Sequence, residues 1–228
     1  VTMSLAALFA TDIAAVLVEP VLANAGCVMP APAYLAALQA IAQRHGALLI
    51  ADEVLMGFRL HAGLSAHAMG LDPDLVTLGK AVGSGLPVAA VAGRPEIMRA
   101  FADGRGVRAG TYSGNPMSCA AVIATLAMLD AADYPALLAR GDALRGAIVD
   151  AFARAGVAVS TSGHGSVFSL WPEAEPPRDY AQARAMLRPD WSAALHGALR
   201  RRGVLLMPSG YGRMFLSFAH DDAVLEGI

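Results

Sequence analysis

"ALLIADEV" at residues 47–54 is a run of apolar residues that ends in two adjacent carboxylates. Strands buried on both faces of a parallel sheet have this pattern. Helical spacing of apolar residues is found at "PAYLAALQAIAQRHG" (32–46), directly before this run. Three further runs are typical of strands, namely "IAAVLVEP" (13–20), "LVTLGK" (75–80) and "VAAVAG" (88–93). Strands separated by helices predict an α/β fold with a mostly parallel sheet and helices on its faces.

The pattern changes between about residues 130 and 155. An alanine-rich helix is expected from Pro116 past Leu129, with a break near Tyr134. Beyond it the sequence predicts short strands at 157–163, 166–172, 203–208 and 214–220, and helices at 180–188 and 191–203. We therefore expect two domains, residues 1–130 and a smaller α+β domain over residues 131–228.

Composition excludes several classes of protein. The 228 residues are 56% hydrophobic and 16% charged with a net charge of −2, which argues against disorder and against nucleic-acid binding. The apolar runs at 13–23 and 86–93 are shorter than the roughly 20 residues of a membrane span. The first twelve residues lack the basic flank of a signal peptide. Two distant cysteines and the absence of a zinc spacing favour a cytoplasmic protein without a metal site.

Lys80 is the only lysine beside 16 arginines. A lysine can lose its proton and form an imine, whereas an arginine cannot. Glu19, Asp52 and Lys80 each follow a strand-like run, and ligands of α/β proteins bind beyond the carboxyl ends of strands. Taken one at a time, each of these three residues could equally be a helix cap, an ion-pair partner or a solvated charge. Together, a lysine and an acid meet the needs of pyridoxal 5'-phosphate (PLP), which requires a Schiff-base lysine and an acid at its pyridine nitrogen.

Four segments then point to a family. They are "AAVLVEPVLANAG" (14–26), "ALLIADEVLMGFR" (47–59), "DPDLVTLGKAVGSGLPVAAVAGRPEIM" (72–98) and "AGTYSGNPMSCAA" (109–121). In order and spacing they resemble the class III aminotransferases of PLP fold type I, closest to the glutamate-1-semialdehyde 2,1-aminomutase branch. The resemblance extends over almost the whole chain. It implies that residues 1–130 form the C-terminal part of a large PLP-binding domain and residues 131–228 an incomplete small domain.

The resemblance also implies roles for single residues. Lys80 would form the Schiff base and move a proton between Cα and C4′. Asp52 would bind the pyridine nitrogen, and Val54 would pack on the ring. Asn24 would lie near the phenolic oxygen of the cofactor, although an ordinary turn residue is an equal reading.

Further roles involve a homodimer with shared active sites. Thr111 and the amide of Gly110 would bind the cofactor phosphate of the partner subunit, unless Thr111 is the cap of the following helix. Glu19 would support the wall of the active site on the substrate side. The upstream half of the large domain, with part of the phosphate site, is absent, so we expect a chain that is truncated at both ends and binds PLP weakly by itself.

One departure from the aminomutase branch concerns the activity. The branch has a glutamate in a "PSxFEAGF" element, and the matching "PSGYGRMF" (208–215) has Gly212 at that position, followed by Arg213. Arg213 could bind a substrate carboxylate through its planar fork, or could be a solvated arginine at the end of a strand. We therefore favour an aminotransferase over the mutase. The alternatives are a decarboxylase or racemase of the same fold and a non-catalytic fragment.

Overall fold

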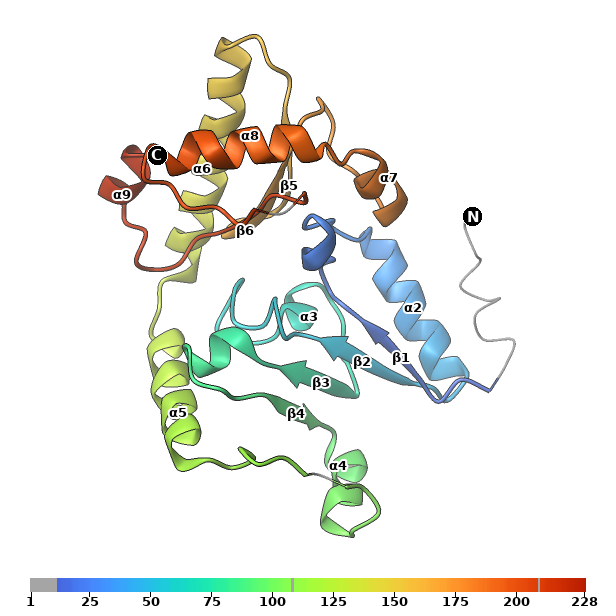
Figure 1. Cartoon of the computed structure of the whole chain (residues 1–228). Helices are drawn as coiled ribbons and strands as arrows, with labels where there is room; N and C mark the ends of the chain where they lie inside the picture. Colours follow the sequence, from blue (N-terminus) through green and yellow to red (C-terminus); the bar gives the residue numbers. More distant parts are fainter. Residues whose placement is uncertain (1–11, 108, 209) are drawn as a thin grey trace. The chain divides into compact units, whose positions relative to one another are not determined.

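The computed structural model describes residues 12–107, 109–208 and 210–228. The segment that we expect not to be a signal peptide therefore lies almost entirely outside the described residues. Two compact units are present (Figure 1): the first holds the described residues up to Pro20 and Ala31–Ala131, and the second holds Val21–Pro30 and Ala132–Ile228. The units divide close to residue 130, but residues 21–30 group with the second unit. The assignment of these units to a PLP-binding domain and a small domain stays a prediction.

The first unit is built on a four-stranded sheet in the order β1-β2-β3-β4. The first three strands are parallel and β4 is antiparallel to β3, as the mostly parallel prediction requires. The strands are β1 (Ala15–Val18), β2 (Leu48–Asp52), β3 (Leu75–Leu78) and β4 (Ala90–Gly93). The helices are α2 (Pro32–Arg44), α3 (Ser65–Ala68), the 3-10 turn η2 (Lys80–Gly83), α4 (Pro95–Ala102) and α5 (Pro116–Asp130).

The hydrophobic core of the first unit covers one face of the sheet and leaves the other face available for a functional site. Leu35 and Leu38 of α2 are buried together with Leu49 and Ala51 of β2 and Val76 of β3. Because side chains alternate along a strand, Asp52 and its pairing partner on β3 project from the face opposite to this core. The helix α2 thus covers one face and leaves the other to the polar strand ends.

The second unit contains an antiparallel sheet in the order β5-β6-β7. Its strands are β5 (Ser160–His164), β6 (Val167–Trp171) and β7 (Arg213–Phe215), and its helical elements are η1 (Ala23–Ala25), α6 (Tyr134–Arg154), α7 (Tyr180–Ala185), α8 (Pro189–Arg200) and α9 (Asp222–Glu226). Every residue of β6 is buried. The expected break between two long helices is present, since α5 ends at Asp130 and α6 begins at Tyr134.

Two predicted strands of the second unit are wrong or too long. Residues 203–208, all described, contain no strand: Val204 N donates to Leu199 O at 3.0 Å, which continues the end of α8, and Leu205 is 82% exposed. Of the strand expected at 214–220, only the first residues pair, and the chain then turns where His220 N donates to Ser217 O. Apolar content alone therefore overestimated the strands, because it does not show whether a neighbouring strand is available for pairing.

Apolar side chains also remain at the surface of the first unit. All four residues of β4 are exposed, and Met117, Ile123 and Met128 of α5 are each at least 70% exposed. Within the described residues no single helix has the length and hydropathy of a membrane span; α5 and α6 pass such a test only when they are counted together as a bent pair.

Candidate active site

The carboxyl ends of three parallel strands bring the predicted residues of the first unit to one edge of the sheet (Figure 1). Glu19 directly follows β1, Asp52 ends β2, and Lys80 comes two residues after β3. Val18 pairs with Ala51, so Glu19 and Asp52 are the next positions along neighbouring strands. Glu19 is half-buried there. The sheet register therefore places two carboxylates and the single amine at the same edge.

Asp52 is held in one orientation by hydrogen bonds to a single oxygen. Its Oδ1 accepts from the backbone N–H of Val54 at 3.0 Å and from Oγ1 of Thr77 at 3.2 Å. Thr77 is the residue that pairs with Asp52 across β2 and β3. No hydrogen bond to Oδ2 is made within the described part of the chain, and the residue is only half-buried. The carboxylate is thus fixed through Oδ1 and presents Oδ2 as an acceptor.

Lys80 begins the turn η2 with a backbone that lysine rarely adopts. Its φ is +48°, in the left-handed region, where an L-residue is strained by about 1–2 kcal/mol. The side chain is exposed, and none of the described carboxylates forms an ion pair with it. The helix α5 packs on η2, and Oγ of Ser118 donates to the carbonyl of Pro87 at 3.1 Å. Neighbouring structure thus holds a strained residue whose amine is not neutralised by any carboxylate in the described ranges.

Val54 lies against the residue before the lysine. A Cβ atom at Gly79 would be only 3.3 Å from Cγ1 of Val54, tighter than ordinary van der Waals contact. Glycine at this position lets the side chain of Val54 approach the backbone that leads into Lys80. The structure therefore brings Asp52, Val54 and the segment of Lys80 close to one another, and their roles at a cofactor stay a prediction.

Glu53 is a buried acid at this edge to which the sequence reading gave no role. It is 1% exposed, and its Oε1 accepts from the backbone N–H of Ala66. Oε2 is buried and has no hydrogen-bond partner within the described residues. The hydroxyl of the nearby Ser65 donates to Met56 O. Burial raises the pKa of Glu53 above its ordinary value of 4.5, while the hydrogen bond from Ala66 acts in the opposite direction.

Replacement of Glu53 by glutamine should change how stability depends on pH. A raised pKa means that the folded chain binds the proton more tightly than the unfolded chain. This stabilisation is fully present below the unfolded value near 4.5 and is lost as pH rises through the folded pKa. The Glu53→Gln variant should therefore match the wild type at low pH and exceed it by about 1–3 kcal/mol at neutral pH. Urea unfolding of both proteins from pH 4 to 8 measures the difference, and parallel curves would contradict the assignment of a buried neutral acid.

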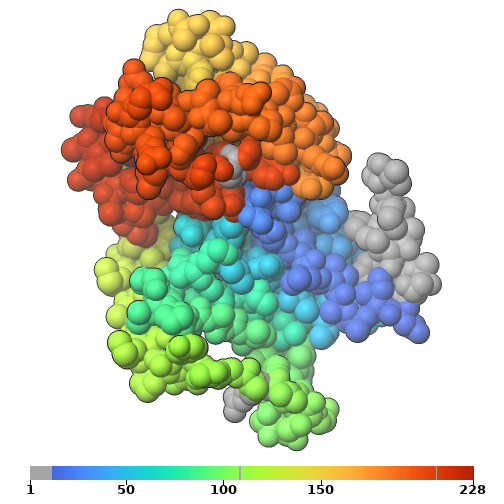
Figure 2. All heavy atoms as spheres, viewed as in Figure 1, coloured from blue at the N-terminus to red at the C-terminus, as the bar shows by residue number. Residues whose placement is uncertain are grey.

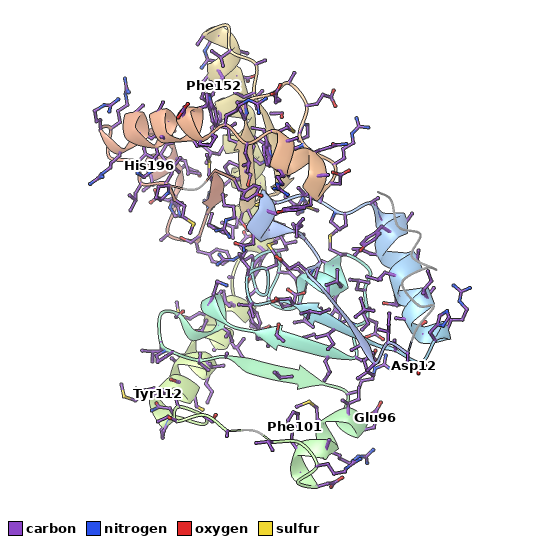
Figure 3. The ribbon with its side chains drawn as sticks, turned by 45° about the vertical axis from the view of Figure 1, so that its right-hand side comes forward. Asp12, Glu96, Phe101, Tyr112, Phe152 and His196 are labelled. Atoms are coloured by element: carbon purple, nitrogen blue, oxygen red, sulfur yellow. The ribbon has the colours of Figure 1, made fainter. Side chains whose placement is uncertain are left out.

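Gly110 and Thr111 are exposed and belong to the segment that leads into α5. The atoms of this segment lie at the surface of the first unit in Figure 2. Ser113 N donates to Gly110 O at 3.0 Å. The cap of α5 is Asn115, whose Oδ1 accepts from Met117 N and Ser118 N, so Thr111 is not the helix cap. The side chain of Tyr112, 67% exposed and labelled in Figure 3, comes from the same segment. The helix-cap role, which was the alternative for Thr111, is therefore excluded, and its phosphate-binding role stays a prediction.

Asn24 and Arg213 meet in the second unit. Nη1 of Arg213 donates to Oδ1 of Asn24, and Nη2 lies 3.5 Å from the sulfur of Met207. The two residues are 189 positions apart in the sequence. Arg213 therefore already uses part of its fork within the protein, which sequence spacing gave no means of predicting.

A largely apolar cavity of about 1110 Å³ is also bordered by Arg213. Its lining residues come from α6, α8, β6, β7, α9 and their connections, all within the second unit. It therefore contains neither Asp52 nor Lys80. Among the described residues no group of three histidine, cysteine or acidic side chains could hold a metal ion.

Comparison with known proteins assigns the family. The family described as "Aminotransferase class-III" matches residues 2–215. Glutamate-1-semialdehyde 2,1-aminomutase from Nitratidesulfovibrio vulgaris is 42% identical over 95% of this chain and 51% of its own length. The chain thus spans about half the length of the curated relatives it matches.

Solved structures agree. A β-phenylalanine aminotransferase from Variovorax paradoxus superposes with a TM-score of 0.84 at 34% identity, over 95% of this chain and 50% of that one. A glutamate-1-semialdehyde aminomutase from Pseudomonas aeruginosa in complex with PMP superposes with a TM-score of 0.87 at 27% identity, over 98% and 52%.

The fold is that of the PLP-dependent transferases of fold type I, and this confirms the predicted fold class. The chain belongs to the class III aminotransferase family. The resemblance drawn from the four sequence segments is thereby confirmed, and PLP is confirmed as the cofactor of this class. The family and its relatives include both aminotransferases and aminomutases, so the activity of this chain is a separate question.

Proposed function

We propose that the protein is a PLP-dependent aminotransferase that moves an amino group from an amino acid or amine to an oxo acceptor. The observation that carries the proposal is the arrangement at the sheet edge: Asp52 has a carboxylate fixed through Oδ1, and Lys80 has an amine that forms no ion pair with any described carboxylate. PLP supplies an aldehyde that condenses with amines and a protonated pyridine ring that withdraws electrons from the substrate Cα. The donor set suits this group, because it offers one amine for the aldehyde and one acid for the ring.

Each residue of the first unit then has a task. Lys80 would hold PLP through its Nζ amine, and the same amine would act as the general base that takes the proton from Cα of the amino donor. Asp52 would hold the pyridine nitrogen of PLP in its protonated form through Oδ2, while Thr77 and Val54 fix Oδ1. Val54 would pack on the cofactor ring, and the absence of a side chain at Gly79 leaves space for the side chain of Val54.

The family resemblance implies roles for the remaining predicted residues. Thr111 and the amide of Gly110 would bind the cofactor phosphate across a homodimer, and Glu19 would lie on the substrate side. The resemblance also implies a cofactor role for Asn24 and a substrate role for Arg213. These assignments and the homodimer rest on the family resemblance, whereas the cytoplasmic location rests on the two distant cysteines of the sequence.

Glutamate-1-semialdehyde 2,1-aminomutase is the second candidate, because relatives with that name are more than 40% identical to this chain. Against it stands Gly212 in place of the glutamate of that branch. A mutase exchanges the amino group within one molecule, whereas an aminotransferase needs a donor and an acceptor.

Turnover with and without a co-substrate separates the two candidates. The PLP-loaded full-length gene product should convert an amino donor only when an oxo acceptor is added, with one oxo product released for each amine formed. The control is glutamate-1-semialdehyde alone, which should be left unchanged. Conversion of that compound without a co-substrate would replace the aminotransferase by the mutase, and release of CO2 or of an inverted amino acid would replace both.

A further inference from the structure

Buried side chains close the loop that follows β2 in the first unit. We call residues 54–64 the edge loop, because this loop begins at the carboxyl end of β2 and returns to α3. At its base, Oε1 of Glu53 accepts from the backbone N–H of Ala66. Oγ of Ser65 donates to the carbonyl of Met56 at 2.7 Å. Glu53, Ser65 and Ala66 are each at most 1% exposed, so two hydrogen bonds shielded from water tie the ends of the edge loop together.

The backbone of Glu53 is held as well as its side chain. Its N–H donates to Thr77 O at 3.0 Å, which continues the pairing of β2 with β3, and its carbonyl accepts from Gly57 N at 2.9 Å. A Cβ atom at Gly57 would lie 2.8 Å from that carbonyl, so only glycine permits this close turn. Glu53 stands between Asp52 and Val54, and Val54 N–H donates to Oδ1 of Asp52. A rotation of the backbone at Glu53 would therefore move the donor that orients the Asp52 carboxylate.

Glu53 and Asp52 project from opposite sides of the sheet. Leu49 and Ala51 of β2 belong to the hydrophobic core. Because side chains alternate along a strand, Glu53 projects to this core side and Asp52 to the other side. Ala66, which donates to Glu53, belongs to the same core. Glu53 can therefore affect a molecule bound beside Asp52 only through the backbone that joins the two residues.

Residue 53 has to supply a hydrogen-bond acceptor. Ala66 is fully buried, and its N–H donates to Oε1 of Glu53. An apolar side chain at residue 53 would leave this N–H without that acceptor, and a buried donor without a partner is destabilising. Burial raises the pKa of Glu53, while hydrogen bonds with Ala66 and Ser65 act in the opposite direction. Burial thus disfavours a charge at residue 53, and the acceptor oxygen is what the loop requires.

We propose that Glu53 is a positioning residue: by tying the edge loop to α3 on the core side of the sheet, it holds Asp52 and Val54 in place on the other side. This inference rests on the proposed function, under which Asp52 and Val54 contact PLP. Glu53 itself contacts neither PLP nor substrate. Its effect reaches the site through the backbone of residues 52–54.

Glu53→Met keeps the approximate length of the side chain but removes the acceptor. In the full-length gene product without PLP, hydrogen–deuterium exchange of the amides in residues 54–66 should rise by about tenfold or more, because the edge loop opens more often. With PLP bound, kcat should fall roughly tenfold while KM for the amino donor stays within about twofold. The reason for this split is that a misplaced Asp52 affects the chemical step and not the binding of the donor.

Glu53→Gln is the rescue variant. Glutamine keeps an acceptor oxygen for Ala66 N, so exchange in the edge loop should be no faster than in the wild type and kcat should be close to it. Asp74→Leu is the matched control, since Oδ2 of Asp74 accepts from Leu49 N at 2.7 Å at the opposite end of β2. It should lower thermal stability but leave kcat and the exchange of the edge loop unchanged. In the Asp52→Asn background, Glu53→Met should lower kcat little further, because Glu53 acts through Asp52.

An unchanged kcat in folded Glu53→Met, or an equal loss of kcat in Glu53→Gln, overturns the positioning role and leaves the proposed function intact. If Glu53→Met does not fold, Glu53→Asp takes its place, because its side chain is one methylene shorter and is drawn away from Ala66 N. It should show the same rise in exchange and fall in kcat, and wild-type values of both would count equally against the inference. A wild-type protein that forms no coloured complex with PLP overturns the proposed function and the positioning role with it.

Discussion

The Lys80→Ala variant is expected to lose turnover by at least about 10³-fold, because it removes both the covalent anchor of the cofactor and the base that takes the proton from Cα. The wild-type protein with PLP should form an adduct that borohydride reduces and that mass spectrometry locates at Lys80. The variant should bind PLP without such an adduct.

Lys80→Arg is the matched control for charge. Arginine keeps the positive charge after β3 and the strained backbone, but it cannot form an imine. It should therefore be as inactive as the alanine variant. Activity in either variant, or a reduced adduct at another residue, would show that Lys80 is an exposed surface lysine and nothing more.

The Asp52→Asn variant is expected to bind PLP but to lose turnover by about 10²–10³-fold. An asparagine oxygen can still accept from Val54 N and from Thr77 Oγ1, so the strand end should keep its structure. What is lost is the negative charge that keeps the pyridine nitrogen protonated. Steady-state kinetics and thermal unfolding, measured side by side, separate the loss of charge from the loss of structure.

Thr77→Val provides the control for orientation. It removes one hydrogen bond of 3.2 Å to Asp52 but leaves the carboxylate, so turnover should fall by less than about tenfold. Turnover at the wild-type level in Asp52→Asn would show that Asp52 has only a structural role at the end of β2. The proposed function would then lose the observation on which it rests.

The sequence predicts those residues of the site whose positions follow from the order of the strands along the chain. Asp52 and Lys80 each follow an apolar run, and parallel strands end at one edge of a sheet, so their meeting could be expected. Thr77 and Gly79 depend on the register between β2 and β3, and the sequence does not contain that information. The burial of Glu53 follows from how residues 54–66 fold back, so that Ala66 N reaches its carboxylate.

The second unit was less predictable for the same reason. Residues 203–208 have the apolar composition of a strand but no strand to pair with among the described residues. Asn24 and Arg213 were each noticed in the sequence, one from the family pattern and one as a departure from it. Only the folded chain brings them into contact, because no local spacing rule relates positions so far apart.

The exposed Lys80 has a practical consequence for chemical labelling. It is the only side-chain amine in these 228 residues, and none of the described carboxylates pairs with it. An acylating reagent that is specific for amines therefore has one side-chain target in this part of the protein. The extent of acylation at Lys80 therefore measures the fraction of molecules in which this amine is free to react. No other lysine in these 228 residues contributes to the signal.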